Sequence, residues 1–130
     1  MKLLLDTHIA FWAIFDPDKL SAVAKKLISD GDNDIYVSSL SFYEIAIKHF
    51  FSPEKMPVSG EQFAEYSQGF GMTELPLHSA DIGGFASLIK NEHHDLFDRI
   101  ILGVAKSRNM MLLTHDGKLA GYGEDCVLSV

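Results

Sequence analysis

Short apolar segments alternate with amphipathic segments along the chain, and this alternation constrains the fold more than any other feature. Strand-forming residues gather at 2–5, 35–37, 75–77, 110–113 and 127–130, and helical periodicity runs through 8–15, 21–29, 41–51, 61–70, 80–90 and 100–108. Short apolar strands separated by helices favour a parallel sheet that is covered on both faces. Because no long linker or internal repeat interrupts the pattern, we expect one α/β domain over residues 1–130.

The composition indicates where such a domain works. The longest apolar run, Ile9–Phe15, is shorter than the roughly 18 residues that a membrane helix needs, so no membrane partner is expected. Asp6 interrupts the N-terminal leucines and breaks the apolar core of any signal peptide. The single cysteine, Cys126, cannot form an internal disulfide, which agrees with a reducing compartment. We therefore expect a cytoplasmic protein.

The net charge argues against simple attraction to nucleic acid. Eleven Lys and Arg against eighteen Asp and Glu leave a formal charge of −7. The field of such a chain repels phosphate groups. Either the partner is not a nucleic acid, or some of the acidic residues bind metal cations that reverse the local field.

Acidic residues stand near the ends of the expected strands. Asp6 follows the first strand, Asp116 follows the strand at 110–113, and Glu44 and Asp98 lie at the starts of two helices. Functional groups at the carboxyl ends of parallel strands meet at one edge of the sheet. Carboxylates that approach one another raise each other's pKa unless a cation lies among them, and oxygen ligands favour Mg²⁺ or Mn²⁺.

Taken singly, most of these acids also have a structural interpretation. Asp6 and Asp95 could cap the N-termini of helices, and Asp98 is a first-turn acid that a helix dipole favours. Asp116 could begin a turn. Only their joint placement at one edge of the sheet indicates a site.

Glu44 has a structural interpretation of its own. The spacing Ser41-x-x-Glu44 predicts a capping box, in which the two side chains bond to each other's backbone N–H groups. Glu44 also lies four residues before Lys48, which predicts an ion pair on the helix surface.

Other conspicuous residues have plainer interpretations. Phe11 and Trp12 lie in an apolar helical segment and are expected in the core rather than in a base-stacking surface. His93 and His94 lack companions at zinc-ligand spacing, so no zinc site is expected. The chain contains no Walker loop, no G-x-G-x-x-G and no G-x-S-x-G, and this leaves nucleotide binding and serine hydrolysis without support.

Three segments together resemble a known family. The segments LLLDTHIAFWA, VSSLSFYEIAIK and HHDLFDRIILGVAKSRNMMLLTHD, in this order and spacing, are similar to the PIN domain in its branch of VapC-type toxins of toxin–antitoxin pairs. The resemblance implies a three-layer α/β/α PIN-like domain with a central parallel sheet. It also implies a metal-dependent endoribonuclease that hydrolyses RNA phosphodiesters with one or two Mg²⁺ or Mn²⁺ ions. A small antitoxin protein as partner and a homodimer follow from the same resemblance.

The resemblance also assigns site residues. The family's four acids, which are its catalytic and metal-binding residues, match Asp6, Glu44, Asp98 and Asp116, and supporting positions match Thr7, Asp95 and Thr114. One departure is Leu96, since this branch usually has proline between the two acids of the D-P-F-D-R segment. Gly103 and Lys106 also stand where small or apolar residues are commoner, which concerns packing more than chemistry.

Basic residues and two rival functions complete the expectations. Candidate contacts to the RNA backbone, which could equally form a solvated surface, are Lys48, Arg99, Lys106, Arg108 and Lys118.

Two other functions are compatible with these features. One rival is a PIN-domain nuclease of RNA processing that works without an antitoxin. The other is a receiver-type signalling module, also small, acidic and Mg²⁺-binding, but no acid directly ends the strand at 35–37 as that module would need.

Overall fold

A five-stranded parallel sheet forms the centre of the computed structural model, which describes residues 1–90 and 95–130. The strand order is β3–β2–β1–β4–β5. The strands are β1 (Lys2–Leu5), β2 (Asp34–Ser38), β3 (Thr73–Leu75), β4 (Met111–Thr114) and β5 (Val127–Ser129). In the register, Leu4 lies opposite Tyr36 of β2 and Leu112 of β4. The predicted α/β fold with a central parallel sheet is confirmed.

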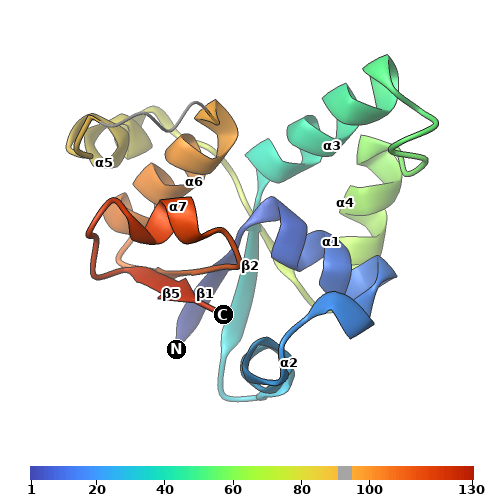
Figure 1. The fold of residues 1–130 in the computed structure, drawn as a ribbon, viewed down its shortest axis with the longest axis horizontal. Helices are drawn as coiled ribbons and strands as arrows, with labels where there is room; N and C mark the ends of the chain where they lie inside the picture. The colour runs from blue at the N-terminus through green and yellow to red at the C-terminus, as the bar shows by residue number, and fades with distance from the viewer. Residues whose placement is uncertain (91–94) are drawn as a thin grey trace.

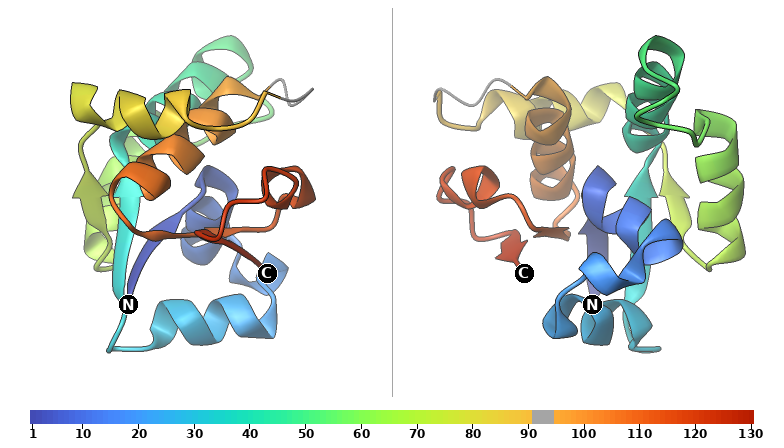
Figure 2. Two further views of the ribbon diagram at one scale, coloured as in Figure 1. Left: turned by 90° about the vertical axis from the view of Figure 1, so that its left-hand side faces the viewer. Right: turned by 45° about the vertical axis from the view of Figure 1, so that its right-hand side comes forward.

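Helices cover both faces of this sheet (Figure 1). They are α1 (Thr7–Phe15), α2 (Ala22–Ser29), α3 (Ser39–Phe51), α4 (Gly60–Gly69), α5 (Ile82–Ala86), α6 (Leu96–Ser107) and α7 (Gly117–Ala120), with short 3₁₀ turns η1 (Pro17–Lys19) and η2 (Ser79–Asp81). The views in Figure 2 place α5, α6 and α7 on one side of the sheet and α1, α3 and α4 on the other.

The alternation of side chains along the strands separates two apolar cores. Leu4 and Leu112 pack with α6, whereas their neighbours Leu5 and Leu113 pack with α1, α3 and α4 on the opposite face. Successive residues of a strand point to opposite faces, so a strand buried on both sides must be apolar at every position. The unbroken leucine run of β1 meets this requirement, and all three of its leucines are fully buried.

Several boundaries differ from the sequence-based expectations, among them the start of α6, which begins at Leu96 rather than at residue 100. The helix expected over 80–90 is only the five-residue α5 after the turn η2, and the strand expected over 75–77 lies at Thr73–Leu75 and ends before Pro76. The capping box between Ser41 and Glu44 is wrong, because α3 begins two residues earlier and its cap is Ser38, whose Oγ accepts from Leu40 N at 3.1 Å.

Two glycines explain the close packing of α5 on α6. A Cβ on Gly84 would lie 2.0 Å from the carbonyl oxygen of Gly103, and a Cβ on Gly103 would lie 2.6 Å from the backbone nitrogen of Phe85. Real Cβ atoms do not approach backbone so closely, so both positions require glycine at this separation of the helices. The contact fixes α5 against the helix that carries Asp98.

Candidate active site

Asp6 lies at the end of β1 and is almost fully buried. Its Oδ1 accepts from Ile9 N at 2.8 Å and thereby caps α1, and its Oδ2 accepts a short hydrogen bond from the hydroxyl of Thr114 at the end of β4. Burial raises the pKa of Asp6, and the charge of Glu44 adds to this, while the hydrogen bonds from Thr114 and Ile9 partly oppose it. Asp6 therefore caps α1, as expected, with its Oδ1 atom. Its Oδ2 atom takes no part in the cap and faces Thr114.

Glu44 points into the same region from α3 and is only 2% exposed. Its Oε2 accepts from Lys48 Nζ at 2.8 Å, which confirms the expected pair. Its Oε1 is buried without a hydrogen-bond partner among the described residues. An unsatisfied buried carboxylate oxygen costs free energy, so this atom marks a place suited to a cation or another donor.

Asp98, in the first turn of α6, has a pKa that burial and the charges of the other acids raise. It is 6% exposed, and its pKa is raised to about 8 by burial and then by the charges of Asp95, Asp6, Glu44 and Asp116. Carboxylates that influence one another in this way lie in one electrostatic neighbourhood. The structure thus brings together the acids that the sequence placed near the strand ends.

The supporting residues fix the elements around these acids. Thr7 Oγ1 donates to Ser41 Oγ at 2.8 Å and joins α1 to α3. Asp95 caps α6 by accepting from the backbone nitrogens of Phe97 at 3.1 Å and Asp98 at 3.3 Å, as expected. Thr114 accepts from Asp116 N at 3.0 Å while it donates to Asp6, so one hydroxyl links the ends of β1 and β4 to the start of α7.

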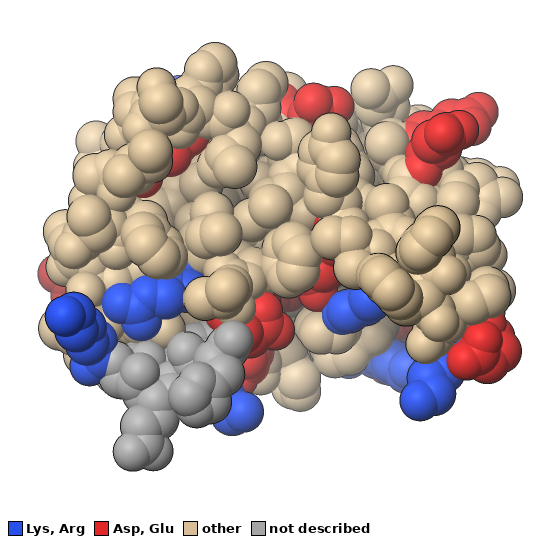
Figure 3. Space-filling view, turned by 90° about the horizontal axis from the view of Figure 1, so that it is seen from above, with Lys and Arg blue, Asp and Glu red and all other residues tan. Residues whose placement is uncertain are grey.

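Asp116 itself caps α7 and borders a cavity. Its Oδ1 accepts from Lys118 N at 2.9 Å. The cavity has a volume of about 210 Å³ and is lined by Asp6, His8, Trp12, His115 and Asp116. Acidic side chains also gather near the centre of the largely uncharged face in Figure 3. The edge of the sheet therefore combines carboxylates with a hollow that a small part of a ligand could enter.

The donor set fits a hard divalent cation. The grouped ligands are carboxylate oxygens, with no thiol among them, and such sets bind Mg²⁺ or Mn²⁺. The unsatisfied Oε1 of Glu44 and the raised pKa of Asp98 both indicate negative charge that a cation would stabilise. Within the described residues no three side chains already form a finished metal cage. Carboxylate rotamers would therefore have to adjust when a cation binds.

Four of the five basic candidates have partners within the protein. Lys48 pairs with Glu44, and Lys106 Nζ donates to Glu124 Oε1 at 2.8 Å. The guanidinium of Arg99 donates to Tyr122 Oη at 3.0 Å and lies over the ring of the same tyrosine. Lys118 is exposed on α7, two residues after Asp116, which caps this helix.

Arg108, the fourth basic residue with a partner, is half-buried and forms an ion pair with the buried Asp81, which is not one of the four grouped acids. Its Nε and Nη2 donate to the two carboxylate oxygens of Asp81 at 2.8 and 3.1 Å, and Ser107 Oγ donates to Asp81 at 2.8 Å. Burial opposes ionisation of Asp81, but the hydrogen bonds from Arg108, His78 and Ser107 and the charge of Arg108 lower its pKa overall. This bidentate pair uses the guanidinium face that would otherwise bind a phosphate.

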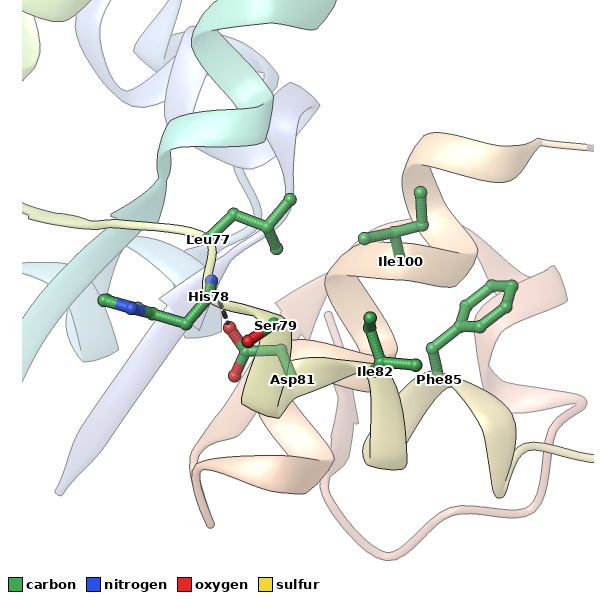
Figure 4. A pocket seen from close by; sticks show the side chains of 7 residues that line it. All are labelled: Leu77, His78, Ser79, Asp81, Ile82, Phe85 and Ile100. Atoms are coloured by element: carbon green, nitrogen blue, oxygen red, sulfur yellow. Dashed lines mark hydrogen bonds between the residues drawn. The ribbon is translucent and has the colours of Figure 1, made fainter.

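A second and larger cavity lies beside this ion pair (Figure 4). Its volume is about 450 Å³, and apolar side chains of Leu77, Ile82, Phe85 and Ile100 line most of it. None of the four grouped acids lines it. The cavity therefore offers mainly apolar contact, and the carboxylate that lines it, Asp81, is already engaged by Arg108 and Ser107.

Sequence reasoning missed three rings beside the acids. Trp12 packs against the core as expected but is only half-buried, and its indole contacts the imidazoles of His8 and His115 at centroid distances of 5.8 and 5.6 Å. The signal was present in the sequence, because each histidine stands next to or two residues from a grouped acid, and Trp12 follows His8 by one helical turn. His93 and His94 lie outside the described residues.

The chain is thus a small α/β domain with a parallel sheet. Buried carboxylates at the carboxyl edge of this sheet form a candidate metal centre. The PIN domain family model matches residues 3–124, and the chain belongs to this family. Because the chain belongs to the PIN domain family, it is not a receiver-type signalling module. No helix in the described part of the chain is long and apolar enough to cross a membrane.

Individual proteins of known name are similar along nearly the whole chain. Ribonuclease VapC22 of Mycobacterium tuberculosis is 28% identical over 126 residues, which cover 92% of this chain and 91% of that protein. The fold is similar to the crystal structure of VapBC2 from Rickettsia felis bound to a DNA fragment from their promoter, with a TM-score of 0.66, 20% identity and coverage of 100% and 98%. It is also similar to VapBC-1 from nontypeable Haemophilus influenzae, with a TM-score of 0.65, 17% identity and coverage of 99% and 98%.

Proposed function

We propose that the protein is a metal-dependent endoribonuclease and the toxin of a type II toxin–antitoxin pair. The observation that carries this proposal is the group of acids formed by the buried Asp6, Glu44 and Asp98 and the half-buried Asp116, which share one electrostatic neighbourhood at the carboxyl edge of a PIN domain. The similarity to a protein named as a ribonuclease supports RNA as the substrate. The net charge of −7 is compatible with RNA only if cations offset the acids at the site.

The residues of the chain have distinct tasks in this mechanism. Asp6, Glu44 and Asp98 would hold the cation, and Asp116 would assist them. A Mg²⁺ or Mn²⁺ ion held there would lower the pKa of a water molecule and provide positive charge for the phosphate. Lys48 holds one oxygen of Glu44 at 2.8 Å and leaves the other available, and the Thr114 hydroxyl orients Asp6.

A partner protein and a second copy complete the proposal. An unrestrained ribonuclease would damage the cytoplasm in which we place it, so we expect an antitoxin that covers the acids with a basic residue. Exposed apolar side chains support protein contacts, and on α3 they form a stripe of Tyr43, Ile47, Phe50 and Phe51. We expect a homodimer as well, which light scattering after gel filtration would measure.

RNA cleavage by purified variants tests the catalytic proposal. Asp6→Asn and Asp98→Asn should each abolish cleavage in Mg²⁺ or Mn²⁺ without unfolding the domain, and the double variant should lose little more than either single one, because the acids act as a unit. Asn at position 6 keeps an oxygen for Ile9 N and thus preserves the cap of α1. Asp125→Asn, in an exposed loop, is the control and should cleave normally. Cleavage at the wild-type rate by Asp98→Asn would remove the site assignment.

Co-expression separates a toxin from an RNA-processing nuclease. Expression of the protein alone should arrest growth, and expression together with a small protein encoded directly upstream should restore it. An active ribonuclease that leaves growth intact and has no such neighbour would favour the RNA-processing alternative.

A further inference from the structure

The cavity beside Asp6 and Asp116 has a wall made of three rings. His8 and Trp12 lie one helical turn apart on α1, and their ring planes are inclined by 44°. His115 reaches the same indole from the end of β4, edge-on at 68°. Residues from two separate parts of the chain thus place aromatic surface directly against two of the grouped carboxylates.

These rings differ from the aromatic residues of the core. Phe63 is fully buried between other rings, whereas Trp12 is half-buried and both histidines are exposed. Two of the rings have further contacts. His115 Nδ1 donates to the main-chain oxygen of Val130 at 2.7 Å, and Lys19 Nζ lies 6.0 Å from the centre of the indole. A solvent-accessible aromatic surface next to the grouped acids is suited to stacking with a planar ligand.

We propose that this cavity binds one unpaired nucleobase of the RNA next to the phosphodiester that is cleaved, with Trp12 as the main stacking surface and His8 and His115 as its flanks. This inference rests on the proposed ribonuclease function and adds a binding site for one base of the substrate. A base that stacks on Trp12 must separate from its neighbours in the strand, so the site accepts only an unpaired base.

The charge of the protein explains why stacking matters here. An acidic chain in which Lys48, Lys106 and Arg108 already pair with carboxylates gains little from phosphate contacts. Stacking depends on the π face of the base rather than on its charge, and every base has such a face. The three rings therefore supply affinity and position that the electrostatics of this chain do not.

The chain contains a single tryptophan, Trp12, which makes binding directly observable. The probes are hydrolysis-resistant 2′-O-methyl phosphorothioate hexamers of adenylate and uridylate, and a hexamer of the same backbone without bases, each added in Ca²⁺. Base-bearing hexamers should quench the fluorescence of the wild-type protein, and the base-free hexamer should not. This measurement needs no cleavage, so it remains informative even if the protein is not a ribonuclease.

Substitutions then connect the cavity to RNA cleavage. Trp12→Leu should weaken binding of a labelled single-stranded hexamer by about tenfold and raise KM more than it lowers kcat, because a stacked base is worth about a factor of ten or more. Trp12→Phe should restore most of the loss. Phe70→Leu, which removes an exposed ring elsewhere, is the matched control and should behave as wild type. Thermal unfolding verifies that each variant folds.

The outcomes are separable. If RNA is cleaved but base-bearing and base-free hexamers affect the fluorescence equally, or if Trp12→Leu binds and cleaves normally, the stacking site is wrong and the ribonuclease proposal stands. If RNA is not cleaved in Mg²⁺ or Mn²⁺ but base-bearing hexamers alone quench Trp12, the ribonuclease proposal fails and the base site stands. If quenching is absent and Trp12→Leu loses its fold, Trp12 has only a packing role.

Discussion

Replacing Asp98 with asparagine should stabilise the metal-free protein at neutral pH. The pKa of Asp98 rises from an ordinary 3.8 to about 8, because it is buried and faces the charges of Asp95, Asp6, Glu44 and Asp116. Above pH 4 the unfolded chain loses this proton while the folded protein keeps it. The associated stability is therefore fully present below about pH 4 and is lost as the pH rises towards 8.

The size of this effect follows from the pKa. Each pH unit between the two pKa values lowers the free energy of unfolding of the wild type by about 1.4 kcal/mol, so the interval from pH 4 to pH 7.5 sets an upper bound of about 5 kcal/mol. Water at the edge of the cluster screens the carboxyl, and asparagine loses a favourable interaction of about 0.5 kcal/mol with the α6 dipole. We therefore expect Asp98→Asn to be about 2 kcal/mol more stable than wild type at pH 7.5 and nearly equal to it at pH 4.5.

Urea unfolding in EDTA at pH 4.5, 6.0 and 7.5 measures this difference. Asp125→Asn is the control, since it removes an exposed carboxyl and should show little dependence of its stability difference on pH. Mg²⁺ at a hundredfold excess over its Kd should then add about 2.7 kcal/mol to the wild type at pH 7.5 and little to Asp98→Asn. The electrostatic reasoning is refuted if the difference between Asp98→Asn and wild type does not change with pH, or if the variant is less stable at pH 7.5.

Two further predictions concern the packing and the ion pair behind the site. Gly84→Ala should cost about 3 kcal/mol in thermal or urea unfolding, because its Cβ would lie 2.0 Å from the carbonyl oxygen of Gly103. Gly83→Ala, the neighbouring control with open space around its Cβ, should change stability by about 0.5 kcal/mol or less, and equal losses would contradict the close-packing argument. Arg108→Met should cost about 3 kcal/mol at pH 7, because it leaves Asp81 buried without its bidentate partner. Since the pKa of Asp81 is lowered, the loss of stability caused by Arg108→Met should shrink as the pH falls through that pKa. Urea unfolding at pH 7 and pH 3 measures this. An equal loss at both pH values would mean that the variant lost only packing.

Local patterns were enough to predict the frame of the molecule. The leucine run at residues 3–5 is apolar at every position, as only a strand buried on both faces requires, and amphipathic segments between such runs imply crossover helices. Parallel strands then place Asp6 and Asp116 at one edge. The caps formed by Asp6 and Asp95 were predictable as well, because a cap depends only on residues two or three positions away.

The properties of individual side chains depended on contacts between distant parts of the chain. Ser41 has the spacing of a cap, but its hydroxyl is taken by Thr7 and the helix begins earlier. The sequence also left Arg108 open as a phosphate ligand. In the structure, Asp81 of η2, which lies 27 residues earlier in the chain, pairs with its guanidinium.

The sequence by itself therefore determined the parallel sheet and the edge at which the acids stand, since periodicity and strand direction are local properties. Only the tertiary structure decided the rest. It showed that Glu44 keeps an unsatisfied oxygen, that burial and neighbouring acids raise the pKa of Asp98, and that Trp12, which packs against the core, also lines a cavity. Burial and electrostatic fields arise from whatever packs around a residue, and those neighbours come from anywhere in the chain.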